Sequence, residues 1–327
     1  IPNTDFSAGL VDITNADARK WWKDVIRTEV LGIGASGWMA DFGEALPYDA
    51  RLHSDAAPRA FHNQYPEEWA RLNREAITES GRESELLFFT RSGYRKSPGQ
   101  STLFWLGEQL VTWDVHDGLK SAVVGMLSGG VSGFGVNHSD AGGYTTIVSS
   151  LGRFTRSREL LWRWLELSAL SPVMRTSEGS RPDDNFQIDS DEETLRHFVR
   201  CAKLYKAWSS YRKQLLQQTE QTGMPVARHL ALHYPGDPNV YKLSFQQYLL
   251  GQDLLVAPIT DPGVTVAKVY LPEGTWIHAF SGKRFAAPSM GLHIEIAAPL
   301  GQPALFVRQG SAMSEPFLAA LKDQGLF

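Results

Sequence analysis

The sequence has one cysteine, no long apolar run and no excess of positive charge. Cys201 is the only cysteine among 327 residues, which excludes an internal disulfide and a cysteine-rich metal site. A lone cysteine fits a reducing cytoplasm, which we take as the expected location. The formal net charge is −4, so no basic field attracts nucleic acid or an anionic membrane. No apolar run has the length of a membrane span.

The first ten residues, IPNTDFSAGL, contain no basic segment, apolar core or initiating Met. They are therefore not a signal peptide, and we expect a cut inside a longer chain, or processing. Hydrophobic residues make up 43% of the chain, which predicts one large domain plus a smaller one. The 10 Trp, 10 Tyr and 16 Phe suit a carbohydrate site, although filling a large core is the plainer explanation.

Helical and strand-like segments alternate along the first part of the chain. Helices are predicted over 16–30, 66–80, 117–130, 157–170 and 191–217, and strands over 32–44, 85–93, 101–108 and 131–144. Polar or charged residues follow the strands, which is typical of an α/β fold with its site at the carboxyl ends of parallel strands. About five or six strand–helix units precede residue 230, too few for a complete eight-stranded barrel.

From residue 253 the pattern changes to short β-rich runs separated by Gly, Pro and Asp. Such runs predict a small antiparallel β-domain. We therefore divide the chain into a catalytic part, 1–252, and a structural β-domain, 253–327.

Four carboxylates follow predicted strands and are candidates for glycosidic bond cleavage, which needs two carboxyl groups flanking the anomeric carbon. They are Asp41, Glu44, Glu108 and Asp140. Asp41 follows the buried-looking run SGWMA, so a functional role is favoured over a satisfied structural acid. For Glu108, at the end of LFWLGE, a solvated strand tail is an equal alternative.

Other polar residues allow more than one interpretation. His138 and Asp140 could be two metal ligands, but without an obvious third ligand a loop hydrogen-bond network is favoured and no metal is expected. Arg91 could hold a sugar hydroxyl or an anionic group, or pair with a catalytic acid. Trp38 and Trp105 are each favoured as core residues, although Trp105 precedes a candidate acid. No phosphate-binding or dinucleotide fingerprint occurs, so no organic cofactor is expected.

A series of motifs in order along the chain resembles glycoside hydrolase family 31, and within it the bacterial α-sulfoquinovosidases. The motifs are WMADFGE (38–44), FFTRSG (88–93), FWLGEQ with DGL (104–119), NHSDAGGYT (137–145), MRTSEGSRP (174–182) and LLVAPI (254–259). The resemblance implies part of a TIM (β/α)8 barrel followed by a small antiparallel β-sandwich domain. It also implies that a β-sandwich and the first barrel strands, with further sulfonate ligands, precede this region in the family.

The resemblance also implies roles for residues. Asp41 corresponds to the family's nucleophile, Glu108 to its general acid/base, and Glu44 to a further active-site residue. Arg91, Tyr144, His138, Asp140 and Ser177 correspond to substrate-binding positions, with Tyr144 helping to hold the sulfonate. Trp105 and Trp38, which stand beside the candidate acids, are predicted as further substrate-binding residues. Two residues depart from the family: Glu108 replaces Asp, which moves the carboxyl about 1 Å or more, and Ser177 replaces a sugar-binding His.

The expected reaction is hydrolysis, with retention, of an α-sulfoquinovoside such as sulfoquinovosyl glycerol, with carboxyls about 5 to 5.5 Å apart. The alternatives are an α-glucosidase or α-xylosidase of the same family, a non-catalytic or truncated sugar-binding relative, and a metal-dependent hydrolase using His138 and Asp140. The expected partner is a small sulfonated glycoside; a homo-oligomer stays open.

Overall fold

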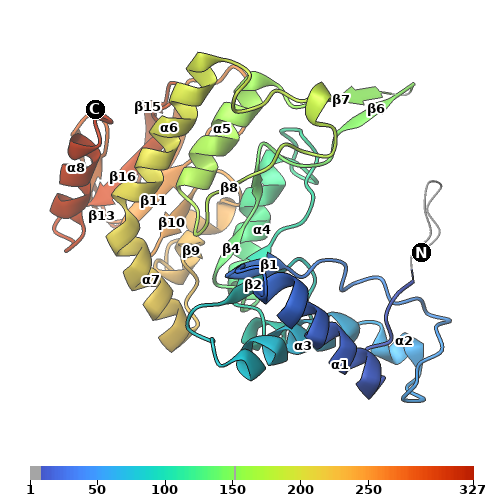
Figure 1. The fold of residues 1–327 in the computed structure, drawn as a ribbon. Helices are drawn as coiled ribbons and strands as arrows, with labels where there is room; N and C mark the ends of the chain where they lie inside the picture. The colour runs from blue at the N-terminus through green and yellow to red at the C-terminus, as the bar shows by residue number, and fades with distance from the viewer. Residues whose placement is uncertain (1–8, 151) are drawn as a thin grey trace. The chain divides into compact units, whose positions relative to one another are not determined.

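A computed structural model describes residues 9–150 and 152–327 of the chain (Figure 1). The chain forms two compact units, one ending at Trp105 and one running from Leu106 to Phe327.

The first unit is built on a short parallel sheet covered by a helix. Its strands are β1 (Gly37–Met39), β2 (Leu87–Thr90) and β3 (Leu103–Trp105), and its helices are α1 (Ala16–Val25), α2 (Pro58–Phe61) and α3 (Tyr65–Ser80). Gly37 pairs with Leu87, and Phe89 with Leu103, both in parallel register. Phe88 is fully buried in a cluster with Ile77 of α3, which fixes the face of the sheet that turns inward.

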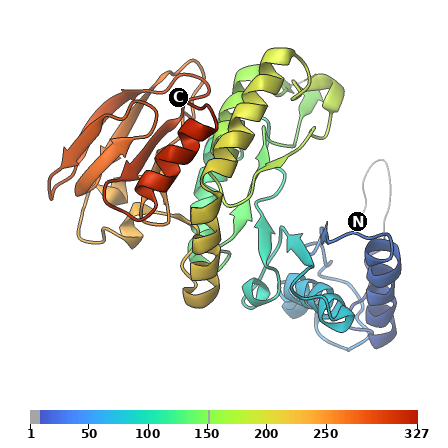
Figure 2. The ribbon, with the colours of Figure 1, turned by 60° about the vertical axis from the view of Figure 1, so that its left-hand side comes forward.

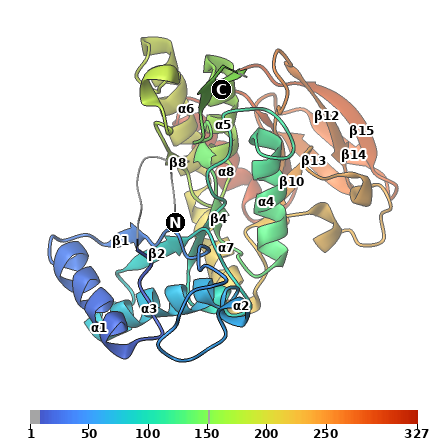
Figure 3. The ribbon, with the colours of Figure 1, turned by 90° about the vertical axis from the view of Figure 1, so that its right-hand side faces the viewer.

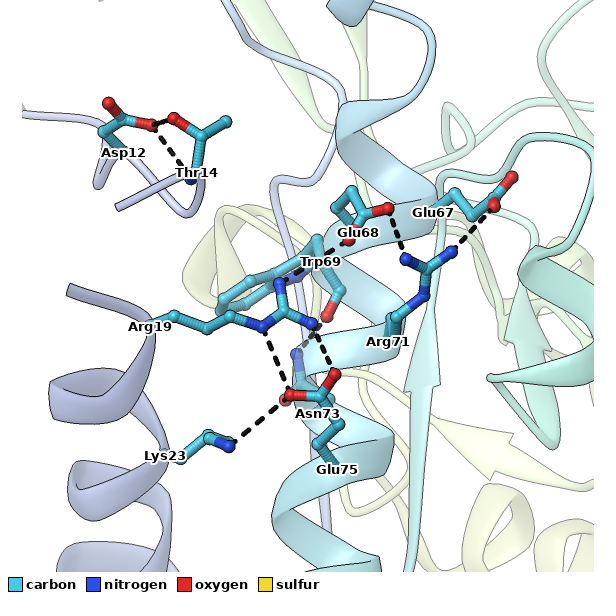
Figure 4. A network of polar contacts seen from close by, with 10 residues as sticks. All are labelled: Asp12, Thr14, Arg19, Lys23, Glu67, Glu68, Trp69, Arg71, Asn73 and Glu75. Carbon is cyan, nitrogen blue, oxygen red and sulfur yellow. Dashed lines mark hydrogen bonds and ion pairs between the residues drawn. The ribbon is translucent and has the colours of Figure 1, made fainter. Parts of the chain in front are cut away.

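Two helices of the first unit, α1 and α3, lie side by side and are joined by ion pairs (Figure 4) and by an aromatic contact. Arg19 Nη2 lies 2.8 Å from Glu75 Oε1, and Lys23 Nζ lies 3.5 Å from Glu75 Oε2. Such partly exposed pairs contribute little each. The Trp22 and Trp69 rings, with centroids 5.5 Å apart, supply the apolar contact.

The helix predicted over 16–30 begins at the predicted residue but changes its geometry. Asn15 caps α1 by accepting bonds from the backbone N–H groups of Asp17 and Ala18. After Val25 the chain continues as a π-helical turn over Ile26–Leu31. Sequence periodicity does not distinguish a π turn from an α turn, so this change was not predicted.

The second unit contains the remaining helices and strands. Its helices are α4 (Leu119–Val131), α5 (Arg158–Ala169), α6 (Glu192–Ala207), α7 (Ser209–Thr222) and α8 (Ser314–Asp323). Its early strands are β4 (Asn137–His138), β5 (Asp140–Ala141), β6 (Ile147–Ser149), β7 (Gly152–Phe154) and β8 (Arg175–Thr176).

Helix α5 is the centre of this unit, because every residue from Leu160 to Ala169 is buried. It packs against β5 and α6. The single helix predicted over 191–217 is two helices, α6 and α7, with a break at Trp208. The Trp208 indole is 1% exposed and donates to the backbone oxygen of Ala169 at 2.9 Å, so burial of this side chain accompanies the break.

The C-terminal part of the second unit is an antiparallel β-domain, as predicted (Figure 3). One sheet has six strands in the order β14 (Arg284–Ala287), β13 (Gly274–His278), β16 (Ala304–Arg308), β11 (Leu254–Ala257), β10 (Tyr248–Leu250) and β9 (Ala227–Arg228). A second sheet pairs β12 (Val266–Leu271) with β15 (Leu292–Ala297). Strands β9 and β10 belong to the six-stranded sheet although they precede residue 253.

A buried ion pair ties helix α5 to the β-domain. Arg163 Nη1 donates to Glu166 Oε2 at 2.9 Å, and both side chains are almost completely buried. Arg163 Nη2 also donates to the backbone oxygens of Val264 and Ala298, and Glu166 Oε1 accepts from Gly301 N at 2.6 Å. Helix α8 adds a further contact by packing beside α6 (Figure 2).

Across residues 9–150 and 152–327, no helix combines the length and the apolar character needed to cross a membrane.

Candidate active site

Asp41 is the second residue past strand β1 of the first unit. Ala40 N donates to Phe89 O at 2.8 Å, which extends the pairing of β1 with β2 up to the residue before Asp41. The Trp69 indole of α3 donates to Ala40 O at 3.2 Å. The backbone that carries the Asp41 side chain is therefore held by the sheet on one side and by α3 on the other.

The residues after Asp41 form a tight turn that also orients its carboxylate. Phe42 has φ +58°, a left-handed conformation that is costly for a residue with a side chain, and its N–H donates to Asp41 Oδ1 at 2.9 Å. Gly43 is packed so closely that a Cβ there would lie 2.6 Å from Ser92 Oγ. Only glycine fits this turn without displacing a neighbour.

Arg91 brings the two predicted acids of the first unit together. Its Nε lies 3.0 Å from Asp41 Oδ1, and its Nη2 donates to Glu44 Oε1 at 2.7 Å. The guanidinium also lies over the Phe42 ring at 4.8 Å and the Trp105 ring at 5.7 Å. The cation therefore pairs with the candidate nucleophile, one of the two interpretations that the sequence left open.

Trp38 lies apart from this group, within the packing between the sheet and α3. Its indole donates to Asn73 Oδ1 at 2.8 Å, and its ring stacks on Phe88 with centroids 6.0 Å apart. These contacts favour the core role that the sequence analysis had preferred for Trp38; its role in substrate binding stays a prediction.

In the second unit, Asp140 and Arg175 are joined across two neighbouring strands. Strand β5 pairs with β8 in parallel, so that Asp140 stands opposite Arg175, and the Arg175 guanidinium donates to Asp140 Oδ1. The Asp140 residue is 0% exposed, and its Oδ2 has no hydrogen-bond partner among the described residues. The ion pair is therefore half buried, because the Arg175 side chain keeps 31% of its exposure.

The electrostatics of Asp140 reflect this burial. The pKa of Asp140 is raised to about 6, mainly by burial and also by the negative charge of Glu108, while Arg175 and Arg156 oppose the rise. Burial outweighs the attraction of the cations, so this carboxyl is easier to protonate than an ordinary Asp.

The loops that carry Glu108 and Tyr144 are hydrogen-bonded to each other. Tyr144 N donates to Gln109 O at 2.8 Å, and Thr145 Oγ1 donates to Glu108 O at 2.8 Å. Glu108 is exposed, and Tyr144 is half-buried. The backbone of the candidate acid/base thus rests on the turn that bears the candidate sulfonate ligand.

Ser177, which replaces the family's His, lies in the loop after β8. Its hydroxyl accepts a bond from Gly179 N at 3.1 Å, so the side chain stabilises its own loop. The nearby Arg156, which the sequence analysis did not single out, donates to Ser177 O at 2.7 Å. The sequence held no signal for Arg156, because its partners are spread over several loops.

His138 is 1% exposed and its backbone oxygen accepts a bond from Leu106 N at 2.9 Å. Within the described part of the chain, no three His, Cys, Asp or Glu side chains gather in a way that could hold a metal ion. The pattern His138-x-Asp140 is therefore not accompanied by a third ligand there.

Comparison with known proteins assigns the family. Residues 2–218 match the TIM-barrel domain of glycosyl hydrolases family 31, and residues 223–313 match the family 31 C-terminal domain. The chain belongs to glycoside hydrolase family 31, which confirms the resemblance inferred from the motifs and the fold class, part of a TIM barrel followed by an antiparallel β-domain.

Within the family, the chain is similar to sulfoquinovosidases. It is 43% identical to the sulfoquinovosidase of Escherichia coli K12 over 98% of this chain and 46% of that protein. It is also 43% identical to the sulfoquinovosidase of Agrobacterium fabrum, over 94% of this chain and 46% of that one. A family 31 sulfoquinovosidase from E. rectale, solved with an aza-sugar inhibitor, superposes with a TM-score of 0.90 at 40% identity, covering 96% of this chain and 46% of that one. The chain thus spans about half the length of the curated relatives it matches.

The predicted site residues therefore fall into two groups. Asp41, Glu44, Arg91 and Trp105 lie together in the first unit, and Glu108, Asp140 and Tyr144 belong to connected loops of the second. That the carboxyls of Asp41 and Glu108 face each other across a sugar stays a prediction.

Proposed function

We propose that the protein is a retaining α-glycoside hydrolase that releases sulfoquinovose from α-sulfoquinovosides such as sulfoquinovosyl glycerol. The observation that carries this proposal is the 43% identity to two sulfoquinovosidases over almost the whole of this chain. The two carboxylates that the chemistry needs, Asp41 and Glu108, stand in motifs that resemble the family's catalytic ones.

In the proposed first step, an Asp41 oxygen attacks the anomeric carbon while Glu108 gives its proton to the departing oxygen. The bond from the anomeric carbon to the leaving oxygen breaks, and a glycosyl ester with Asp41 forms. In the second step Glu108 takes a proton from water, which displaces Asp41 and releases the sugar with retained configuration.

The surroundings of Asp41 suit a nucleophile. Arg91 and the Phe42 N–H both contact Oδ1, which holds the carboxylate in one orientation before substrate arrives. Arg91 in turn is held by Glu44, at 2.7 Å. We propose that Glu44 keeps this cation in place, so that the attacking carboxylate is positioned by a network and not by one contact.

On the sugar, we propose that the Tyr144 hydroxyl donates a hydrogen bond to the sulfonate. A phenolic hydroxyl can donate one bond to an anionic oxygen, and such charge-assisted bonds are stronger than neutral ones. Because Ser177 is shorter than the imidazole found at its position in the family, we propose weaker contact to a sugar hydroxyl there.

The test compares matched aryl glycosides, the α-sulfoquinovoside and the α-glucoside, with the full natural chain. We expect hydrolysis of the sulfonated substrate to be strongly preferred. Asp41→Asn should lower kcat by roughly a thousandfold or more. Asp24→Asn changes a partly exposed acid on α1 that pairs with Lys20; it is the matched control and should leave kcat unchanged.

Undiminished turnover by the Asp41→Asn variant would eliminate the double-displacement mechanism. Preference for the glucoside would keep the mechanism and move the substrate to the α-glucosidase alternative. Binding of sulfoquinovose without turnover by the wild type would favour a non-catalytic relative.

A further inference from the structure

We propose that Arg156 is a positioning residue of the substrate-binding wall in the second unit, where it holds the Tyr144 turn and the Ser177–Glu178 loop in one arrangement. The inference rests on the proposed function, because it assigns to this cation the placement of the side chains that would contact the sulfonated sugar. Nothing in the sequence distinguishes Arg156 from the neighbouring arginines.

The guanidinium of Arg156 bonds to the backbone of the two loops that carry candidate substrate contacts. Arg156 is 2% exposed. Its Nη1 donates to Ser177 O at 2.7 Å and to Gly143 O at 3.4 Å, and its Nη2 donates to Glu178 O at 3.2 Å. One buried group therefore connects the residue before Tyr144 to the loop after β8.

A third segment completes the set of acceptors. Arg156 Nε donates to Phe186 O at 2.9 Å, and Nη2 donates to Gln187 Oε1 at 2.8 Å. The backbone N–H of Arg156 donates to Asn185 Oδ1 at 2.9 Å. Gln187 also donates from Nε2 to Glu178 O at 2.9 Å, so the segments are linked to one another as well as to the cation.

The aliphatic part of the Arg156 side chain packs closely against the turn that contains Gly142. Gly142 has φ +93°, and a Cβ on it would lie 2.5 Å from Arg156 Cδ. The turn can approach the arginine this closely only because Gly142 has no side chain. Beyond this point Tyr144 O accepts a bond from Ser180 N at 2.9 Å, which ties the tyrosine's own backbone to the loop held by Arg156.

The hydrogen-bond acceptors of the Arg156 guanidinium are neutral carbonyl and amide oxygens. The positive charge of Arg156 acts on the Asp140 carboxyl through a longer-range electrostatic interaction. Burial lowers the pKa of Arg156 to about 10, with the charge of Asp140 opposing that shift, so the group stays protonated at neutral pH. By contrast, Arg163, another buried arginine of the second unit, pairs directly with Glu166 and joins α5 to the β-domain. The hydrogen bonds of Arg163 go to Glu166, Val264 and Ala298, none of which is a candidate substrate contact, so Arg163 is the matched control.

The experiment compares Arg156→Lys and Arg163→Lys in the full natural chain. Lysine keeps the charge but has at most three donors on one nitrogen, so it cannot reproduce the hydrogen bonds that Arg156 donates from three separate nitrogens. We expect Arg156→Lys to raise KM for the aryl α-sulfoquinovoside by roughly tenfold, with a smaller change in kcat, since a misplaced wall weakens binding. Arg163→Lys should lower the Tm but leave KM within about twofold.

Coupling to Tyr144 gives a readout that a purely structural role would not move. If Arg156 acts through Tyr144, the KM increase in Arg156→Lys combined with Tyr144→Phe will be smaller than the product of the single effects. Gln187→Ala removes a half-buried brace of the guanidinium, so it is a milder variant that decides the question if Arg156→Lys does not fold. It should raise KM in the same direction by roughly twofold or more.

The outcomes separate this inference from the proposed function. Equal losses of Tm in both Lys variants with unchanged KM, or an unchanged KM in Gln187→Ala, overturn the positioning role and leave the hydrolase proposal intact. A KM increase in Arg156→Lys combined with Tyr144→Phe that equals the product of the two single increases also overturns the positioning role. A wild type that does not hydrolyse the sulfonated glycoside overturns both proposals.

Discussion

Replacing Asp140 by Asn tests whether burial or ion pairing dominates at the edge of β5. Burial raises the pKa of this carboxyl to about 6 from the ordinary 3.8. Between these two pH values the folded chain binds more protons than the unfolded chain, so the contribution of Asp140 to stability falls as the pH rises through this window. The full difference, from 3.8 to about 6, corresponds to about 3 kcal/mol.

The assay is urea unfolding of the wild type and of Asp140→Asn at several pH values from 4 to 7. The Asn amide does not titrate, yet keeps an oxygen for Arg175. The free energy of unfolding of the wild type minus that of the variant should fall by about 2 kcal/mol from pH 4 to pH 7, because pH 4 already lies just above the unfolded pKa. Asp114→Asn is the control: the hydrogen bond from Thr112 lowers the pKa of Asp114, so its window lies below the range and its difference profile should be flat. A difference that rises with pH for Asp140→Asn would show that the cation outweighs burial, and would refute the reasoning.

Two further predictions concern the buried pair and the strained turn. Arg163→Met should cost about 3 to 5 kcal/mol in the free energy of unfolding, because it leaves the Glu166 carboxylate buried without its cation; combining it with Glu166→Met should recover part of that loss in denaturant titrations, and no recovery would contradict the assignment. At the Phe42 turn, the left-handed φ of +58° predicts that Phe42→Gly is more stable than Phe42→Ala by about 1 kcal/mol, the reverse of the usual order; thermal unfolding of the two variants decides it.

The sequence predicted the position of Asp41 well because a local signal was sufficient. An apolar run followed by an acid predicts a carboxylate at the end of a strand, and the structure has β1 followed by Asp41, with a side chain 15% exposed. The run SGWMA was also expected to be buried, and this is wrong for most of it: Gly37 and Met39 are exposed and only Ala40 is buried. Arg91 directly follows strand β2 in the same way, and parallel pairing of β1 with β2 brings the two strand ends together. Hydrophobic periodicity and local composition are enough to predict that such residues lie at the ends of strands.

Other features depend on contacts that no local pattern contains. The break between α6 and α7 accompanies burial of Trp208 against Ala169, which lies 39 residues away. The role of Trp38 depends on Asn73 of α3 as its partner. Arg156 donates to acceptors in three loops, whereas its sequence neighbour Arg153 is exposed and Arg158 is half-buried, so only the folded chain identifies which arginine connects the loops.

The extent of the β-domain shows the same limit. Its sheet takes in β9 and β10, which precede residue 253, because β10 pairs with β11 through Leu249 and Leu255. The change in sequence texture that suggested residue 253 marks where β-rich runs become frequent, whereas membership of a sheet is decided by pairing. The division at residue 253 stays a prediction.

The most direct test of the account is to trap the proposed glycosyl ester. The full natural chain is incubated with a slow-reacting fluorinated α-sulfoquinovosyl fluoride, digested, and examined by mass spectrometry. The account predicts one added sugar mass per chain, on the peptide that contains Asp41, and none in the Asp41→Asn variant. A label on a different residue, or steady hydrolysis with inverted configuration at the anomeric carbon, would contradict it.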